Sequence, residues 1–196
     1  MEVKRIVTGK LRENCYVLVS DEQAVIIDPG ADFELINSGL AGAIPGLILL
    51  THGHYDHIGA VKALVAEYAA AEVCVSALDV ELLEAPEKNM SLWGDQLVSD
   101  IRADVLLHDG DLLNFSGSII KVIGTPGHTR GSVCFGVEGI LFSGDTLFKG
   151  AVGRTDLYGG DSASLSKSLE KLRQLDVNTI VYPGHGFRTT IGAELS

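Results

Sequence analysis

Basic residues are scarce in this chain. Its 196 residues include 15 Lys and Arg against 26 Asp and Glu, which gives a formal net charge of −11 at pH 7. The few basic residues are also scattered, so the sequence lacks the positive patch that attracts nucleic acid or anionic membranes. We therefore expect no nucleic-acid partner and no membrane partner, and nuclease chemistry is disfavoured.

Long hydrophobic segments are missing as well. The N-terminal stretch MEVKRIVTGK lacks the apolar core of a signal peptide, and the apolar runs elsewhere are far too short to span a bilayer. The sequence therefore predicts a cytoplasmic protein, and the lack of a secretion signal argues against a β-lactamase.

Cysteine is rare and odd in number. Cys15, Cys74 and Cys134 are far apart, and each stands among apolar residues. This setting is typical of buried strand thiols rather than of a disulfide or a catalytic thiol.

The length and the hydrophobic content fit one globular unit. With 46% hydrophobic residues and 23 Gly, the chain can bury a sizeable core and make many tight turns. No linker or low-complexity stretch divides it, so we expect one domain over residues 1–196, made of two β-rich halves at about 1–100 and 101–196. Packing these halves as a sandwich with helices outside is the economical architecture.

Short apolar runs closed by Gly, Pro or Asp predict the strands. The expected strands are EVKRIVT, CYVLVS, AVIIDPG, GLILL, AEVCVS, ADVLLH, DLLNFS, SIIKVIGT, SVCFGV, ILFSGDT and TIVYPGHG. Helical spacing of apolar residues predicts helices over about 32–40 and 58–70, and a third behind an Asp161 or Ser162 cap. Ser76 and Asp79 suggest a capping box that opens a short helix. Residues 86–100 show no clean period and are a candidate mobile flap.

The segment LILLTHGHYDHIGA, residues 47–60, ends a buried strand with a crowd of metal-binding side chains. They are His52, His54, Asp56 and His57. His52 and His54 are two apart and project to the same side of an extended strand end, while turns at Gly53 and Gly59 would bring the other two back toward them. Three imidazoles and a carboxylate suit Zn²⁺, and also Fe or Mn. The sequence therefore predicts a metal site in a strand-to-helix loop.

Three later residues complete a candidate ligand set, each where an apolar run meets a loop. They are His128 in GTPGHTRGS, Asp145 in LFSGDTLF and His185 in VYPGHGF. With these motifs the chain resembles the metallo-β-lactamase-fold hydrolases over about residues 3–190. Within that superfamily it is similar to the glyoxalase II-like, or hydroxyacylglutathione hydrolase-like, group.

The resemblance implies a fold and a ligand assignment. The implied fold is of the α+β class, an αββα sandwich of two mixed β-sheets with helices on both outer faces and the site at one edge of the sheets. The implied first metal site is His52, His54 and His128, and the second is Asp56, His57 and His185. Asp145 would bridge the two ions, and Asp56 and Asp145 are also the candidates for a part in catalysis.

Two divalent ions, zinc in the first place with iron or manganese as alternatives, can share one water and lower its pKa toward about 7. We therefore expect a metal-dependent hydrolase that attacks a small-molecule acyl thioester, such as S-lactoylglutathione, with a metal-bridging hydroxide. One alternative is a persulfide dioxygenase, whose single iron would be held by His52, His128 and Asp145. A lactonase or another acyl hydrolase of the same fold is a further alternative. A non-catalytic binding protein is disfavoured because no expected ligand has been lost.

The segment LFKGAVGRTDLYGGD resembles the stretch that contacts the substrate carboxylate in glyoxalase II enzymes. Arg154 stands where those enzymes carry a lysine, and we favour it over Lys149 as the anion contact, with a structural ion pair as the alternative. Asp156 replaces their tyrosine, and the chain stops eleven residues after His185 without a C-terminal glutathione-clamping helical domain. We therefore expect loose binding of glutathione.

Three further polar residues receive weaker expectations. His108 in LLHDGD is expected outside the site, as a strand-end histidine before a turn. Trp93 and Tyr55 are equally compatible with lining the pocket and with ordinary packing.

Overall fold

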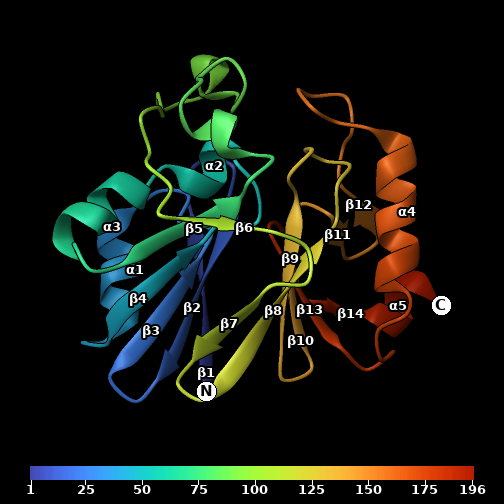
Figure 1. Cartoon of the computed structure of the whole chain (residues 1–196), viewed down its shortest axis with the longest axis horizontal. Coiled ribbons are helices and arrows are strands. Elements are labelled where there is room, and N and C mark those ends of the chain that lie inside the picture. Colours follow the sequence, from blue (N-terminus) through green and yellow to red (C-terminus); the bar gives the residue numbers. More distant parts are fainter.

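Two six-stranded β-sheets face each other in the computed structural model, which describes all residues 1–196 (Figure 1). The first sheet has the order β1 (Glu2–Thr8), β2 (Glu13–Ser20), β3 (Gln23–Ile27), β4 (Ile44–Leu49), β5 (Glu72–Ser76) and β6 (Val105–Leu107). The second has the order β14 (Thr189–Thr190), β13 (Ile180–Pro183), β10 (Ile140–Gly144), β9 (Val133–Val137), β8 (Ser118–Gly124) and β7 (Leu112–Phe115). A separate hairpin pairs β11 (Leu147–Phe148) with β12 (Ala151–Val152).

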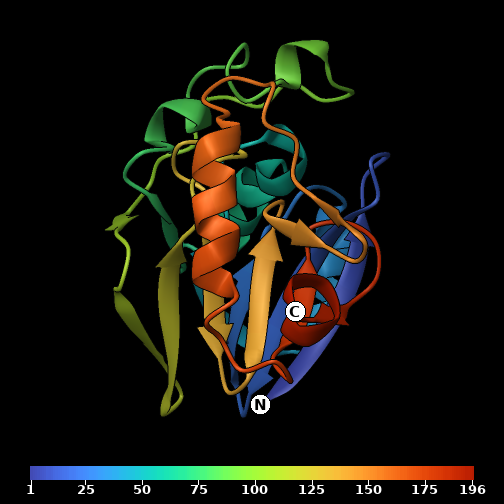
Figure 2. The ribbon, with the colours of Figure 1, turned by 90° about the vertical axis from the view of Figure 1, so that its right-hand side faces the viewer.

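Helices cover both outer faces of this sandwich. On the side of the first sheet lie α1 (Phe33–Leu40), α2 (Tyr55–Ile58) and α3 (Val61–Glu67), and on the side of the second lie α4 (Ser162–Leu172) and α5 (Ile191–Leu195). Figure 2 shows α4 running along the outer face of the second sheet. The predicted αββα sandwich is confirmed. None of the helices combines the length and the apolar character needed to span a bilayer.

Both sheets are mixed, and their strand directions determine where the loops meet. In the first sheet β3, β4, β5 and β6 are parallel, so β3, β4 and β5 end at one edge. In the second sheet β9 is antiparallel to both β8 and β10, and β13 is parallel to β10, so β8, β10 and β13 also end together. The polar residues that follow these strands are therefore gathered at one end of the sandwich.

Three apolar layers hold the sandwich together. One lies between the first sheet and its helices, one between the two sheets, and one between the second sheet and α4 and α5. Cys15, Cys74 and Cys134 each belong to a different layer, and all three are buried free thiols, as predicted. Burial raises the pKa of the Cys74 thiol to about 12 and that of Cys134 to about 11, so neither is a reactive thiolate at neutral pH.

Most predicted elements are present, with three differences. The helix expected over 58–70 is divided into α2 and α3, and α2 begins inside the histidine motif at Tyr55. The hairpin β11–β12, the strand β14 and the helix α5 were not predicted, since each is five residues or shorter. Residues 86–100 contain one short 3₁₀ helix, η2 (Ser91–Trp93). The predicted cap of α4 is Asp161, whose carboxylate accepts a hydrogen bond from the Ser164 amide at 2.6 Å.

The capping box predicted at Ser76 and Asp79 is wrong. Residues Val80–Leu83 form a 3₁₀ helix, η1, and the Asp79 carboxylate makes no cap. Instead Asp79 is fully buried and accepts hydrogen bonds from the Gly53 amide (3.1 Å), the Thr129 hydroxyl (2.7 Å) and the Gly131 amide (2.7 Å). One carboxylate thus ties the loop after β4 to the loop after β8.

We predict that Asp79→Ala lowers the free energy of unfolding by about 3 kcal/mol or more. Three buried donors lose their acceptor, and each unsatisfied group costs about 1–3 kcal/mol. Urea denaturation followed by circular dichroism measures the change. Glu87→Ala is the control, because Glu87 is an exposed acid without a hydrogen-bonded partner. A loss below about 1 kcal/mol in Asp79→Ala would contradict the role assigned to this residue.

Candidate metal centre

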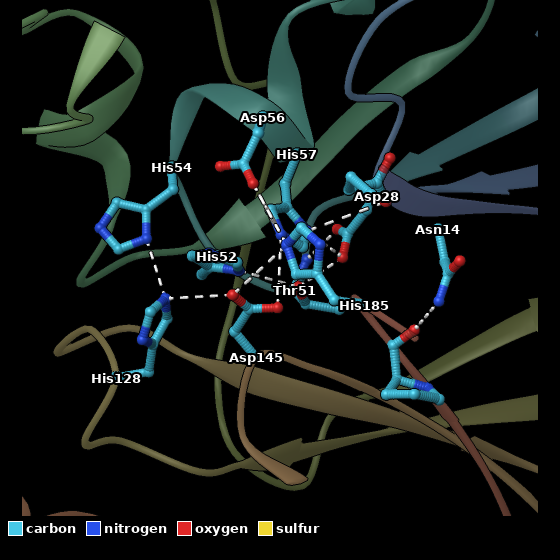
Figure 3. Close-up of polar contacts among 12 residues, drawn as sticks. Asn14, Asp28, Thr51, His52, His54, Asp56, His57, His128, Asp145 and His185 are labelled. Atoms are coloured by element: carbon cyan, nitrogen blue, oxygen red, sulfur yellow. Dashed lines mark hydrogen bonds and ion pairs between the residues drawn. The ribbon is translucent and has the colours of Figure 1, made fainter. Parts of the chain in front are cut away.

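All seven side chains predicted as metal ligands lie together where the two sheets end (Figure 3). His52 and His54 follow β4, and His57 lies in α2. The other sheet contributes the loops after β8, β10 and β13, which carry His128, Asp145 and His185. Residues up to 133 positions apart in sequence are thus neighbours, because the four strands that precede them, β4, β8, β10 and β13, end at the same edge of the sandwich.

The first group consists of three imidazoles. One ring nitrogen from each of His52, His54 and His128 lies within 4.8 Å of the others. Burial lowers the pKa of His54 to about 3, and burial together with the neighbouring imidazoles also places the pKa of His52 well below its usual value. Both rings are therefore neutral at pH 7 and offer lone pairs. Together with His128 these two imidazoles form a nitrogen-only ligand set.

The second group combines a carboxylate with two imidazoles. Single ligand atoms of Asp56, His57 and His185 lie within 4.8 Å of one another. His185 Nε2 is 3.2 Å from Asp56 Oδ2, and His57 Nε2 is 3.7 Å from the same oxygen. This mixed N and O set suits Zn²⁺, Fe or Mn.

Asp145 lies between the two groups (Figure 3). Its Oδ1 is 3.4 Å from His57 Nε2, while its Oδ2 is 3.6 Å from His128 Nε2 and 3.7 Å from His185 Nε2. A single carboxylate therefore faces the imidazoles of both groups, which is the position that a bridging ligand requires.

Several atoms of this cluster are buried without a hydrogen-bond partner. They are the Nε2 atoms of His52, His54 and His57, and Asp145 Oδ1. Buried polar atoms are normally paired, so four unpaired polar atoms in one cluster require an explanation. A bound cation supplies it, because a cation accepts electron pairs from imidazole and carboxylate alike. The residues present therefore fit divalent metal ions.

The charges of the cluster also favour a cation. Burial alone would lower the pKa of His57, but the carboxylates of Asp145, Asp56 and Asp28 outweigh it and hold that pKa well above the usual value. Burial would raise the pKa of Asp145, yet the neighbouring imidazoles keep it well below its usual range. The carboxylates are therefore ionised at pH 7, and the surroundings stabilise positive charge.

Hydrogen bonds from behind orient the imidazoles. His57 Nδ1 lies 2.9 Å from Asp28 Oδ2, which leaves Nε2 toward the cluster. The Thr51 hydroxyl donates to Asp28 at 2.6 Å, so its oxygen accepts from His52 Nδ1 at 3.1 Å. In the same way His128 Nδ1 donates to the Arg154 carbonyl at 2.8 Å. Each contact fixes the tautomer that a metal-binding ring needs.

Asp28 was not predicted as part of the site, because in AVIIDPG it looks only like a residue that closes a strand. Asp28 has a left-handed backbone, with φ of 51°, and its side chain is buried. In addition to its contacts with His57 and the Thr51 hydroxyl, its carboxylate accepts a hydrogen bond from the Thr51 amide at 2.7 Å. The signal was available, because an Asp that ends a buried parallel strand points to the same edge as the histidines of the next strand.

Asn14 and Tyr16 hold the loop that carries His185. Asn14 Nδ2 donates to the carbonyls of Pro183 (2.9 Å) and Gly186 (3.0 Å), and the Tyr16 hydroxyl donates to Pro183 at 2.7 Å. The sequence did not predict this role for Asn14 and Tyr16, because their partners lie nearly 170 positions away on the other sheet. They connect β2 of the first sheet to a ligand loop of the second.

The prediction that the backbone freedom of Gly53 and Gly59 turns the chain is wrong. Neither glycine has a positive φ, and the reversal is made by the helical turn α2. Glycine is needed for space: a Cβ at position 53 would lie 2.5 Å from Leu82 Cβ, and one at 59 would lie 2.3 Å from the Gly30 carbonyl.

A cavity of about 310 Å³ opens beside the ligand cluster. Its apolar lining includes Leu11, Tyr55, Met90, Trp93 and Leu157. Tyr55 and Trp93 thus both reach the pocket, although Trp93 remains 66% exposed. His108 lies outside it, on an exposed turn after β6, as predicted.

The two candidate anion contacts differ in position. Arg154 lines the cavity, whereas Lys149 is exposed and does not line it. The Arg154 guanidinium makes a bidentate pair with Asp156, with Nε 2.7 Å from Oδ1 and a terminal nitrogen 2.8 Å from Oδ2. The ion pair considered as the alternative is therefore formed, and it occupies the donors that an anionic substrate would use.

Curated relatives match almost the whole chain. The probable metallo-hydrolase YqgX of Bacillus subtilis is 36% identical, with 99% of this chain and 94% of the relative covered. The hydroxyacylglutathione hydrolase GloC of Haemophilus influenzae is 32% identical, with 99% of this chain and 95% of the relative covered.

Solved structures share the fold. The B3 metallo-beta-lactamase BLEG-1 superposes with a TM-score of 0.92 at 41% identity, covering 98% of this chain and 95% of the other. TTHA1623, crystallised in a di-iron-bound form, gives a TM-score of 0.86 at 37% identity, with 97% and 96% covered. ETHE1 from Myxococcus xanthus gives 0.80 at 27% identity, with 98% and 80% covered.

A family model agrees with these likenesses and with the geometry of the site. The model of the metallo-beta-lactamase superfamily matches residues 8–185, which include every residue of the ligand cluster. The sandwich and its cluster of His and Asp side chains imply binding of divalent metal. The chain belongs to the metallo-beta-lactamase superfamily.

Proposed function

We propose that the chain is a binuclear metal-dependent hydrolase of acyl thioesters of the S-lactoylglutathione kind. The observation that carries the proposal is the position of Asp145, whose two oxygens face imidazoles of both ligand groups. His52, His54 and His128 would hold one ion, and Asp56, His57 and His185 the other. Zinc is the preferred metal, and iron or manganese are alternatives. When bound, such ions supply an activated water and polarise the substrate carbonyl.

The chain's own residues fit thioester cleavage better than amide cleavage. The carboxylates and imidazoles that line the cavity all belong to the proposed ligand set, so none of them is free to protonate a leaving group. A thiolate needs little such help, because the pKa of its conjugate acid is about 8.5. An amine would require a proton donor, and the cavity offers only the Tyr55 phenol, which is a poor acid because burial raises its pKa above the usual value. The centre therefore favours substrates with a good leaving group.

The likeness to GloC supports the same substrate class. That relative is named a hydroxyacylglutathione hydrolase, and this chain covers 95% of it. The name of this relative thus belongs to a protein that this chain matches along almost its whole length. The TTHA1623 structure, in a di-iron-bound form, supports a centre with two ions.

A persulfide dioxygenase on the same fold is the second candidate. A single iron would need His52, His128 and Asp145 alone. The second group of Asp56, His57 and His185 would then have no purpose, although its atoms converge within 4.8 Å. The complete second group therefore favours the hydrolase.

An activity panel tests the proposed function. Zinc-loaded and iron-loaded protein are assayed with S-lactoylglutathione, a lactone and a β-lactam, and oxygen uptake is followed with glutathione persulfide. We expect thiol release from the thioester to be the fastest reaction. Oxygen uptake by the iron form without thiol release would assign the chain to the dioxygenases, and faster lactone or β-lactam opening would change the substrate class.

We predict that Asp145→Ala loses bound metal and lowers kcat/KM by more than about 100-fold, since even residues that only orient metal ligands cost 10–100-fold when mutated. Elemental analysis and thioester kinetics on the same preparation measure both effects. His108→Ala should remain within about twofold of wild type, because His108 makes no contact with the cluster. If the His108 variant were the more damaged, the proposed site would be wrong.

We predict that Asp156→Asn lowers KM for S-lactoylglutathione about two- to fivefold and changes kcat little. The substitution frees the Arg154 guanidinium for the glutathione carboxylates, and an exposed charge pair contributes up to about 1 kcal/mol. The matched control is a lactoyl thioester of a small uncharged thiol, whose KM should not change. An equal change for both substrates would contradict the anion contact.

A further inference from the structure

A second hollow, of about 520 Å³, lies between α4 and the edge of the first sheet. One wall is α4, and the other is formed by Ser76–Leu78 and Leu107–Asp109, which follow β5 and β6. Its floor is the loop after β8, including Pro126, Arg130 and Ser132. The same loop sends His128 to the metal-centre cavity, so the two hollows share this loop but no lining residue. We name the second hollow the α4 groove.

The α4 groove is positively charged, although the chain as a whole is acidic. Its lining contains Arg130, Lys167 and Lys171 but only one carboxylate, that of Asp109. The full chain, by contrast, has 26 acidic residues against 15 basic ones. An excess of positive charge in a concave site attracts and concentrates anions.

Two of these cations are free to bind a ligand. Lys171 is engaged, since its Nζ lies 2.7 and 2.8 Å from the Asp109 oxygens. Arg130 and Lys167 form no side-chain hydrogen bond and no ion pair. Two other acids interact electrostatically with these cations, Asp161 with Lys167 and Glu81 with Arg130. Both already have partners, because Asp161 caps α4 and Glu81 pairs with Lys88. A guanidinium and an ammonium thus face one groove without a carboxylate partner.

The helix α4 presents one face to the groove. Ser164, Lys167, Ser168 and Lys171 all line it, at the i, i+3, i+4 and i+7 spacing of a single helical face. The Ser168 hydroxyl donates to the Pro126 carbonyl at 2.7 Å, and the Asp161 amide donates to the Gly127 carbonyl at 2.8 Å. Asp79 holds the same loop from the other side through Thr129 and Gly131. The walls and the floor are therefore preorganised.

The groove also contains exposed apolar surface. Leu78 is 65% exposed within its lining, Pro126 is also exposed, and Ala77 is half-buried. A bare inorganic ion would use only the charges, whereas an anion with an apolar body would cover both kinds of surface. We propose that the α4 groove binds a small organic anion, a phosphate monoester or carboxylate attached to an apolar body. This site is separate from the metal centre and does not depend on the reaction proposed above.

Titration of the zinc-loaded protein with phenyl phosphate and, separately, with benzoate tests the proposal. Amide chemical shifts in ¹H–¹⁵N spectra are the measurement. We expect saturable shifts at residues 76–78, 130–133 and 164–171 with at least one probe, and the tighter probe identifies phosphate or carboxylate as the preferred group. Benzylamine has an apolar body of similar size and the opposite charge, and it should not shift these signals.

Paired variants separate this groove from phosphate binding at the metals. Arg130→Gln with Lys167→Gln should weaken probe binding by about tenfold, the factor that corresponds to 1.4 kcal/mol. Arg102→Gln with Lys62→Gln is the matched control, because these exposed cations lie outside both hollows, and its binding should change less than about twofold. The melting temperatures of both double variants are measured as well, and values equal to that of the wild type would show that the four substitutions leave the fold intact.

Three results would overturn the proposal. The first is the absence of shifts in the groove at about 10 mM of either probe, a concentration at which even weak ligands bind. The second is perturbation confined to residues of the metal centre. The third is equal weakening by the groove variant and the control variant.

Discussion

The architecture of the site depends on one electrostatic constraint: imidazole nitrogens and carboxylate oxygens are buried together at the junction of two sheets. Imidazole nitrogens of His52, His54 and His57 and an oxygen of Asp145 have no hydrogen-bond partner there. Such a cluster is unfavourable without positive charge, because buried polar atoms left unpaired cost free energy. Divalent cations remove that cost, so the cation-binding property and the stability of this end of the sandwich are linked.

The ligands keep this arrangement because a second set of buried side chains holds their loops. Asp28 and Thr51 orient two imidazoles, and Asn14 fixes the loop of His185. Asp79 joins the His54 and His128 loops and also forms part of the support beneath the α4 groove. Each of these residues connects segments that are distant in sequence. The metal centre and the groove are therefore two faces of one preorganised loop system.

Local chemistry in the sequence was enough to predict much of the fold and the candidate ligands. Alternating and continuous apolar runs identified most strands, and the dense histidine motif at 52–57 identified the site and, through the resemblance, its three later members. The support residues were not predicted, because Asp28 and Asp79 look locally like a turn residue and a cap. Their partners are set by the meeting of strand ends, which periodicity does not encode. An ion pair of Arg154 was predicted only as an alternative to an anion contact, and its partner Asp156 was not predicted.

The number of metal ions per chain tests the central claim most directly. The claim is that one bridging carboxylate, Asp145, serves two complete ligand groups. Native mass spectrometry of the wild-type protein, titrated with zinc and checked by elemental analysis, measures the stoichiometry. The account predicts saturation at about two ions per chain, with thioester hydrolysis reaching its maximum only at the second ion. Saturation at one ion with full activity would contradict it.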